Sequence, residues 1–319
     1  MKKSRILLIG LVACILLSAC GPAQPDPTRT PPPTYTPFPP IPIADLRPLF
    51  EYDAAAELDV EQAGVEYHGQ VAVHDISYAS PMGGRVTAYL VVPPGEGTFA
   101  AMLFAHPADG SRASFLDEAL ALAQAGVLSL LIDSPWARPE PWQQNLVYSL
   151  PDDRDMYTQE IIDLRRALDL LASHEKVDAE RIGFIGHSYG AHIGGVLSGV
   201  ETRIKAYVFM AGVPSRSDRI PRRITSAIPA DDLAAYLEAT RPFDAIHYVG
   251  HAAPAALFFQ CARQDEVIAE QTSRRYSEAG SQPKQITWYD TGHGLDDQAR
   301  LDRARWLGEY VGLDVSALE

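Results

Sequence analysis

The segment Arg181–Gly195 constrains the fold more than any other part of the chain. An apolar run, Ile182–Ile185, leads into Gly-His-Ser-Tyr-Gly, and small residues typical of a helix start follow. This order predicts a strand that passes directly into a helix through a sharp turn at Ser188. Such a turn strains the serine backbone and needs close neighbours that lack a Cβ, which Gly186 and Gly190 provide. The sequence therefore predicts a serine hydroxyl presented at the edge of a sheet.

Strands and helices are expected to alternate along the rest of the chain. Gln70–Tyr78 and Arg85–Val92, joined by a Gly-rich turn, predict an antiparallel hairpin. The continuous apolar run Phe99–Ala105 predicts a strand buried on both faces, and Val127–Ile132 predicts a second buried strand. Further strands are expected at Ile182–Ile185, Ala206–Ala211, Ala255–Cys261 and Gln285–Tyr289. Helices are expected from the N-cap Ser114 to Gly126, at Tyr157–Ser173, around Glu270–Ala279 and at Asp297–Tyr310. This alternation predicts an α/β fold with a mostly parallel central sheet and helices on both faces.

The N-terminus reads as a targeting segment rather than as part of the fold. Three basic residues precede the apolar run Ile6–Leu17, which is shorter than the roughly 20 residues of a membrane-spanning helix. Leu-Ser-Ala-Cys-Gly then resembles a bacterial lipobox. The resemblance implies a signal peptide at residues 1–19, cleavage before Cys20 and a diacylglyceryl group on the Cys20 sulfur. An uncleaved anchor is the alternative, and either one places the domain outside the cytoplasm, held to a bacterial membrane.

Residues 20–48 are rich in Pro and Thr, with little that could form a core. They predict an extended, semi-rigid linker that holds the following domain away from the membrane. A Pro-rich ligand for the groove of another protein is the alternative.

Composition excludes several other kinds of site. If Cys14 leaves with the signal peptide and Cys20 carries lipid, only Cys261 remains, so the domain has no internal disulfide. Cys261 ends an apolar run, which predicts a buried thiol rather than a nucleophile.

The formal net charge of -14 disfavours a nucleic-acid partner, and scattered carboxylates indicate a solvated surface. No metal site is expected, because five histidines lack partners at metal-ligand spacing: His68, His74, His174, His247 and His251.

A serine hydroxyl needs a base and a third group that orients the base. Asp265 and His293 each follow a late predicted strand, in the order Ser, Asp, His. Glu266 is an alternative orienting residue. His187 and His192 flank the serine and are expected to make structural hydrogen bonds.

From about Phe50 to its end, the chain resembles the α/β-hydrolase superfamily, nearest the dienelactone-hydrolase, acetyl-xylan-esterase and prolyl-oligopeptidase-like branch. The similarity rests on Gly-His-Ser-Tyr-Gly, on Ala-Arg-Gln-Asp at 262–265 and on Gly-His-Gly at 292–294. It implies an α/β-hydrolase domain at residues 49–319, with Ser188 as nucleophile, His293 as general base and then acid, and Asp265 as the orienting group. No cofactor is required.

The resemblance also implies an oxyanion hole formed by two backbone N–H groups. Tyr189, the residue after the nucleophile, supplies one. Ala108 is expected to supply the other, from the segment where relatives commonly carry His-Gly-x. Pro107 replaces that glycine and has no N–H, so Asp109 and Gly110 are alternatives.

These features predict a serine hydrolase that cleaves carboxylic esters through an acyl-enzyme, on a small-molecule or polymer-borne substrate. Its activity should fall below about pH 6.5, the reference pKa of histidine, because a protonated imidazole cannot act as a base. Alternatives are a serine peptidase acting on short peptides and a tethered binding module without catalysis.

The insertion 213–253, with Trp136 and Trp142, is expected to form a lid over the substrate pocket, with mere decoration of the fold as the alternative. Four arginines of this insertion indicate a solvated or internally paired face, with contact to an anionic substrate as the alternative: Arg216, Arg219, Arg222 and Arg223.

Overall fold

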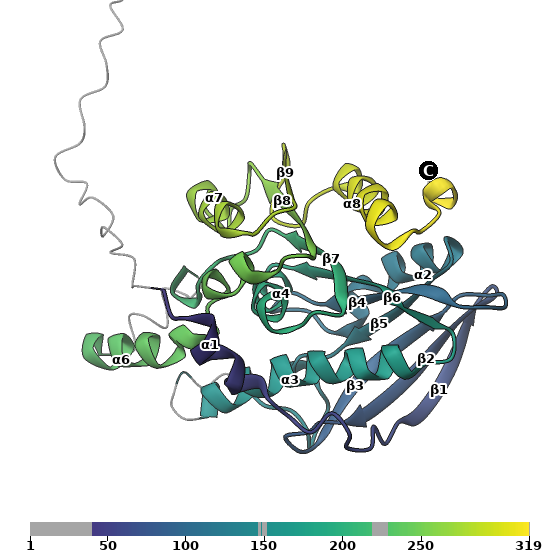
Figure 1. The fold of residues 1–319 in the computed structure, drawn as a ribbon, viewed down its shortest axis with the longest axis horizontal. Coiled ribbons are helices and arrows are strands. Elements are labelled where there is room, and N and C mark those ends of the chain that lie inside the picture. The colour runs from purple at the N-terminus through teal and green to yellow at the C-terminus, as the bar shows by residue number, and fades with distance from the viewer. Residues whose placement is uncertain (1–39, 146–147, 149–151, 219–228, 319) are drawn as a thin grey trace, which may run out of the picture. The chain divides into compact units, whose positions relative to one another are not determined.

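A single nine-stranded sheet runs through the centre of the domain (Figure 1). The computed structural model describes residues 40–145, 148, 152–218 and 229–318 of the 319. The strands, in the spatial order β1-β2-β3-β5-β4-β6-β7-β8-β9, are β1 (Glu61–His68), β2 (Val71–Ala79), β3 (Arg85–Val92), β4 (Phe99–Ala105), β5 (Val127–Ile132), β6 (Val177–His187), β7 (Ile204–Met210), β8 (Ala256–Ala262) and β9 (Lys284–Tyr289).

The strands from β4 to β9 are mutually parallel, whereas β1, β2 and β3 extend the sheet in antiparallel register beyond β5. The helices are α1 (Ile43–Leu46), α2 (Leu116–Gln124), α3 (Asp152–Ser173), α4 (Tyr189–Val200), α6 (Ala230–Thr240), α7 (Glu270–Ala279) and α8 (Asp297–Val311). The predicted fold class, a mostly parallel sheet in an α/β fold, is confirmed.

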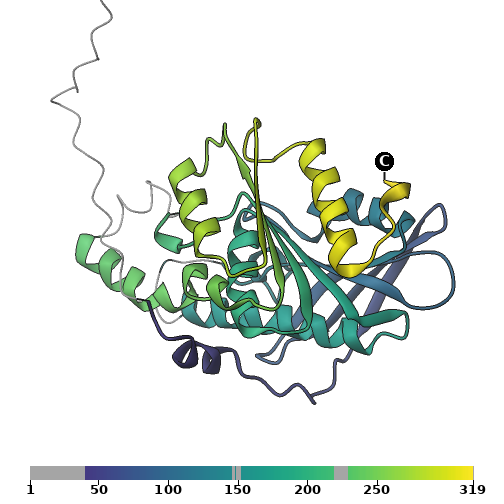
Figure 2. The same cartoon turned by 45° about the horizontal axis from the view of Figure 1, so that its top comes forward.

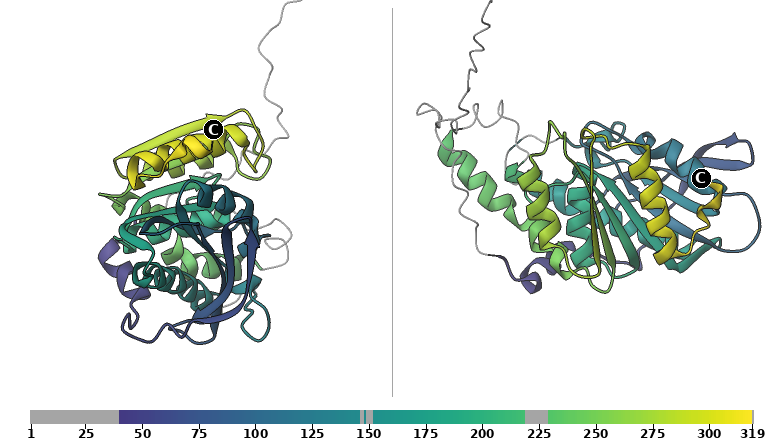
Figure 3. Two further views of the ribbon diagram at one scale, coloured as in Figure 1. Left: turned by 90° about the vertical axis from the view of Figure 1, so that its right-hand side faces the viewer. Right: turned by 90° about the horizontal axis from the view of Figure 1, so that it is seen from above.

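Two separate apolar cores lie on the two faces of the sheet, because alternate residues of each strand point to opposite sides. In β4, for example, Leu103 packs with α3 and α4, whereas Met102 packs with α2 and α8. Figures 1 and 2 show α8 on one side of the sheet and α3 and α4 on the other, and the left view in Figure 3 shows the same layers. The sheet is therefore the rigid middle layer on which the site is built.

The parallel order of the strands collects the residues of interest at one edge. Loops that follow β4, β5, β6, β8 and β9 all leave from the carboxyl ends of parallel strands. Ser188, Asp265 and His293 follow β6, β8 and β9 respectively, so the fold places all three at that edge.

Several elements and boundaries differ from those that the sequence predicts. The edge strand β1 was not expected, because its side chains are almost all exposed and leave no apolar pattern. The N-cap of the helical segment before α2 is Ser111 rather than Ser114. The hydroxyl of Ser111 accepts from the N–H of Ala113, and Ser114 completes the capping box by accepting from the N–H of Ser111.

The folded unit begins at Pro40, earlier than the predicted linker boundary at residue 48. Leu46 of α1 and Phe50 are buried in the core beside α3 and α4, so these residues belong to the domain. The predicted signal peptide, Cys20 and the linker as far as residue 39 lie outside the described residues. Within the described part of the chain, no helix combines the length and the apolar character that crossing a membrane requires.

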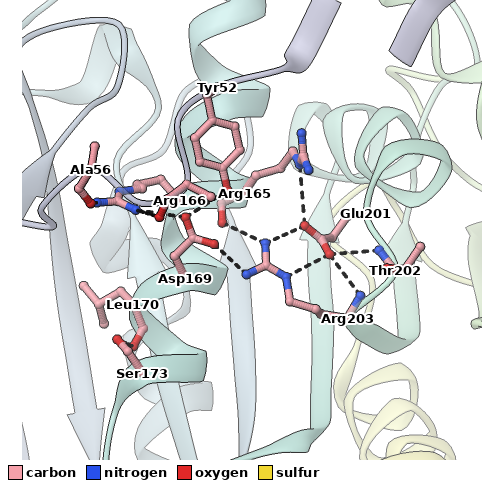
Figure 4. Close-up of polar contacts among 11 residues, drawn as sticks. Tyr52, Ala56, Arg165, Arg166, Asp169, Leu170, Ser173, Glu201, Thr202 and Arg203 are labelled. Atoms are coloured by element: carbon pink, nitrogen blue, oxygen red, sulfur yellow. Dashed lines mark hydrogen bonds and ion pairs between the residues drawn. The ribbon is translucent and has the colours of Figure 1, made fainter. Parts of the chain in front are cut away.

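A cluster of charged side chains fastens the segment after α1 to the domain (Figure 4). The hydroxyl of Tyr52 donates to Oδ2 of Asp169 on α3 (2.9 Å), and Arg203 donates to Oδ1 of the same carboxylate (2.6 Å). Arg203 also pairs with Glu201 at 2.7 Å. Asp169 thus joins the N-terminal segment, α3 and the start of β7 into one charge-assisted network.

Candidate active site

Ser188 occupies the turn that joins β6 to α4. Its φ of 55° and ψ of -109° lie outside the regions that residues with a Cβ favour, a strain of about 1–3 kcal/mol. The N–H of Ser188 donates to the carbonyl of Met210 (2.8 Å), and its own carbonyl accepts from the N–H of His192 (3.1 Å). The strained turn predicted from the sequence is therefore present, and its backbone is held on both sides.

The glycines on either side of Ser188 are required by packing. A Cβ on Gly186 would lie 2.4 Å from the carbonyl oxygen of Gly190, and a Cβ on Gly190 would lie 2.0 Å from that of Ala105. Both contacts are with backbone atoms, which cannot rotate away. The turn can thus form only with glycine at both positions, and the elbow (residues 186–190) rests directly on the end of β4.

Asp265 and His293 are brought together from separate loops. Nδ1 of His293 donates to Oδ2 of Asp265 at 2.8 Å, and the Asp265 side chain is only 2% exposed. Oδ1 of Asp265 accepts from the backbone N–H groups of Val267 and Ile268, both at 2.8 Å. Glu266, the alternative orienting residue, is exposed. Because Nδ1 donates to Asp265, Nε2 of His293 is left to accept a proton.

Asp265 remains ionised in this environment. Burial opposes its ionisation, but the hydrogen bonds from His293, Ile268 and Val267 outweigh burial and lower the pKa of the carboxyl. A fixed negative charge therefore faces the His293 ring, where it would stabilise an imidazolium formed during proton transfer.

His187 ties the elbow to the loop that carries His293. Nε2 of His187 donates to the backbone carbonyl of His293 at 2.9 Å, and the two ring centroids lie 4.8 Å apart. Burial lowers the pKa of His187 to about 4, so the ring is neutral near pH 7. The structural hydrogen bond expected for His187 is confirmed, although the sequence did not indicate its partner.

Among the described residues, no hydrogen bond joins the Ser188 hydroxyl to His293. In structures without a bound substrate this contact is often long, and it shortens in the complex. The strained turn, the Asp265–His293 pair and the His187 bridge nevertheless lie at one edge of the sheet.

The segment 106–110, which follows β4, is held by the side chain of His106. The N–H of Ser134 donates to Nε2 of this ring (3.0 Å), so the ring proton is on Nδ1, which donates to the carbonyl of Pro107 (2.7 Å). Burial lowers the pKa of His106, consistent with a neutral ring. His106 therefore fixes the path of the segment expected to carry the second oxyanion donor.

The three candidate donors in this segment differ in their hydrogen bonds. The N–H of Gly110 already donates to the carbonyl of Pro107 at 2.9 Å. Within the described residues, the N–H groups of Ala108 and Asp109 donate to no protein atom. Gly110 is thus the least suitable of the three. Tyr189, the other expected donor, is the first residue of α4, where backbone N–H groups have no partner within the helix.

A buried carboxylate, which was not predicted from the sequence, lies beside the elbow. Glu160 of α3 is 2% exposed, and its Oε2 accepts a hydrogen bond of 2.5 Å from the Tyr189 hydroxyl. A signal was present, because Tyr157, Glu160 and Asp163 recur at helical spacing on the face of α3 that carries its apolar residues. A polar stripe on such a face indicates buried hydrogen bonds.

The two tryptophans proposed for a lid lie in different places. Trp136 packs edge-on against Tyr189, with ring centroids 4.7 Å apart, so it lies beside the elbow. Trp142 lies next to Gly84, in the turn between β2 and β3.

His192 of α4 holds the insertion at two of its residues. His192 contacts the carbonyl oxygens of Val213 (2.9 Å) and Phe243 (3.1 Å), as expected for a structural histidine. Arg216 is packed internally, which is one of the two arrangements expected for it: its guanidinium lies over the ring of Tyr157, with Cζ 3.1 Å from the ring centroid. Arg219, Arg222 and Arg223 lie outside the described residues.

A groove of about 790 Å³ lies at the opposite edge of the sheet. Its lining includes Pro93, His174 and Lys176, which lie close to the amino ends of β4 and β6. Ligands of parallel sheets bind at the carboxyl ends of the strands, so this groove is not a candidate for the active site.

Cys261 is buried, and burial raises its thiol pKa to about 12, in agreement with the predicted core position. Among the described residues, no group of three or more His, Cys, Asp or Glu side chains is arranged to hold a metal ion.

Comparison with known proteins assigns this arrangement to a family. The sequence profile of the acetyl xylan esterase (AXE1) family matches residues 45–247. No protein with curated annotation matches the chain. Among solved structures, an acetyl xylan esterase from Paenibacillus sp. R4 is similar, with a TM-score of 0.69, 19% identity, and coverage of 84% of this chain and 93% of that chain.

Two further structures share the fold. Acetyl xylan esterase 1 from Thermoanaerobacterium sp. JW/SL YS485 aligns with a TM-score of 0.70 and 17% identity, over 86% of this chain and 96% of that one. The Pyrococcus furiosus esterase Pf2001 aligns with a TM-score of 0.57 and 17% identity, over 75% and 93%. With its α/β-hydrolase fold, the chain belongs to the acetyl xylan esterase family and is a carboxylic-ester hydrolase.

Proposed function

We propose that the enzyme hydrolyses esters through Ser188, His293 and Asp265, with an acyl-enzyme on Ser188. The observation that carries the proposal is the 2.8 Å hydrogen bond from Nδ1 of His293 to the buried carboxylate of Asp265, at the sheet edge where Ser188 occupies its strained turn. A base held by a carboxylate next to a strained serine is the arrangement that activates a hydroxyl.

In the first half of the reaction, the Ser188 oxygen attacks the ester carbonyl carbon while Nε2 of His293 takes the hydroxyl proton. The backbone N–H of Tyr189 and that of Ala108 stabilise the oxyanion. His293 then gives its proton to the leaving alcohol as the tetrahedral intermediate collapses.

In the second half, water attacks the acyl-enzyme and His293 takes a proton from it. Collapse of the second intermediate releases the acid, and the proton on Nε2 returns to Ser188. Asp265 stays ionised throughout and stabilises the imidazolium at each stage.

We propose acetyl groups on a carbohydrate as the substrate class, because the family profile and two similar structures carry the name acetyl xylan esterase. The test is to measure kcat/KM with p-nitrophenyl esters of increasing acyl length, with acetylated xylan and with peptide anilides. Acetyl esters should be preferred, and Ser188→Ala should remove the activity. Preferential cleavage of the anilides would support the peptidase alternative instead.

We also propose that Cys20 carries lipid and tethers the enzyme outside the cytoplasm. The support is the sequence Leu-Ser-Ala-Cys-Gly after a short apolar run. Bacterial cells expressing the full chain with an alkyne-tagged fatty acid should yield labelled protein in the membrane fraction. Cys20→Ser should abolish the label, and a variant that stays labelled would contradict the assignment.

A further inference from the structure

Glu160 is a buried acid whose hydrogen bonding is incomplete. Its Oε2 accepts from the Tyr189 hydroxyl, whereas its Oε1 has no hydrogen-bond partner among the described residues. The buried guanidinium of Arg138 is already paired with Asp163 at 2.7 Å. Within the described part of the chain, no salt bridge includes Glu160, although the Ser134 side chain and the charges of Arg216 and Arg138 also favour its ionised form. The phenol of Tyr189 is its main hydrogen-bond partner.

The buried carboxylate of Glu160 makes the free energy of folding less favourable. An incompletely paired carboxylate costs free energy to bury, and burial raises the pKa of Glu160 to about 7. Apolar residues of α3 such as Ile161 and Leu164 occupy the neighbouring core, where an aliphatic side chain would avoid this cost. A buried polar group that lowers stability, and that is hydrogen-bonded to a residue of the active site, is a candidate for a role in that site.

Tyr189 is held from three directions. Glu160 accepts from its hydroxyl, the ring of Trp136 packs edge-on against it, and Arg216, at the start of the insertion, interacts with its phenol oxygen. The ring therefore joins α3, the loop after β5 and the insertion. Its position also fixes the peptide between residues 188 and 189, because the turn at Ser188 is held by hydrogen bonds on the other side.

The N–H of that peptide is the expected oxyanion donor. Stabilisation by such a donor depends on its direction and distance to a charge that develops only in the transition state. A displacement of about 1 Å is enough to lower a rate by up to about 100-fold.

We propose that Glu160 is a positioning residue for ester hydrolysis: its carboxylate holds the Tyr189 phenol and so aims the Tyr189 backbone N–H at the oxyanion. The proposal rests on the proposed function, in which Ser188 is the nucleophile. Glu160 itself does not touch the substrate.

The test compares three variants. Glu160→Leu removes the acceptor, Tyr189→Phe removes the donor, and Glu160→Gln keeps a carbonyl oxygen that can accept from Tyr189. Rates with p-nitrophenyl acetate are divided by the number of sites labelled with a fluorophosphonate, so that misfolded protein does not count.

For Glu160→Leu and Tyr189→Phe we expect kcat per site to fall about 10-fold, with KM little changed, since the interaction matters in the transition state. Glu160→Gln should stay close to the wild-type kcat. The double variant should be no slower than either single one, because both remove the same hydrogen bond.

Tyr78→Phe is the matched control. The Tyr78 hydroxyl is also buried and donates to α3, but at the carbonyl of Asp163 (3.0 Å) rather than at Glu160. It should lower the unfolding temperature without changing kcat per site.

Two results would overturn the positioning role: wild-type kcat per site in Glu160→Leu, or an equal loss in Glu160→Gln and Glu160→Leu. Failure of the wild-type enzyme to be labelled at Ser188 would instead overturn the proposed function, and the positioning role with it. The two failures are therefore distinguishable.

Discussion

Nε2 of His187 donates a hydrogen bond to the backbone carbonyl of His293, across 2.9 Å. This contact joins the residue before the proposed nucleophile to the residue proposed as its base, although 106 positions separate them in the chain. The elbow and the loop after β9 are thus held to each other by a neutral imidazole.

His187→Ala should therefore weaken catalysis by loosening the His293 loop. We expect kcat to fall about 10-fold, because small misplacements of a base reduce proton transfer. His187→Gln, whose amide can donate to the same carbonyl, should keep more of the activity. Steady-state kinetics with p-nitrophenyl acetate measure both, and equal kcat in wild type and His187→Ala would contradict this role.

Asp265 and Glu266 offer an adjacent pair for testing the orienting group. Asp265→Asn removes the charge that faces the His293 ring and should lower kcat by about 10³- to 10⁴-fold. Glu266→Gln should leave kcat unchanged, because Glu266 is exposed. The reverse outcome, a large loss only in Glu266→Gln, would assign the role to Glu266.

Gly190→Ala should destabilise the whole domain. The added Cβ would lie 2.0 Å from the backbone oxygen of Ala105, so β4 and α4 must separate, at a cost of about 3 kcal/mol. Gly64→Ala in β1 is the matched control, since nothing lies within 4 Å of its Cβ. Urea unfolding measures both variants, and equal stability would show that the elbow has room for a Cβ at residue 190.

The free energy of unfolding of the domain should also depend on pH, because Glu160 titrates at different pH values in the folded and unfolded states. The pKa of this carboxyl is about 7 in the folded state, whereas its ordinary value, which applies to the unfolded chain, is 4.5. Between these values the folded state binds more protons than the unfolded state, so Glu160 lowers stability as pH rises from about 4.5 to 7.

Over that range, wild type should lose about 3 kcal/mol relative to Glu160→Gln, which does not titrate. Urea unfolding of both proteins at pH 4.5 and pH 8 measures the difference. A gap between the two proteins that does not change with pH would mean that Glu160 ionises at its ordinary pKa.

The sequence indicated the parts of the site that depend on local pattern. The turn at Ser188 needs two glycines between a strand and a helix, and this requirement is visible in five consecutive residues. Asp265 and His293 could be named because each follows a predicted late strand. In the structure they meet, since parallel strands end at one edge of the sheet.

Other features of the fold and the site depend on contacts between residues far apart in the chain, so local sequence patterns could not predict them. Glu160 lies 29 positions from Tyr189, and only the packing of α3 against α4 brings them together. The internal partner of Arg216 could not be named, because Tyr157 comes from another helix. Strand β1 was missed because its exposed side chains have no apolar face to reveal it.

The central claim is that the acyl group passes through Ser188. The most direct measurement mixes the enzyme with p-nitrophenyl acetate, quenches with acid within the first turnover, and locates any acetyl adduct by mass spectrometry of the digested protein. We expect one adduct, on the peptide that contains Ser188, and none in Ser188→Ala, which should also be inactive. An adduct on another residue, or a Ser188→Ala variant that hydrolyses the ester at the wild-type rate, would contradict the account.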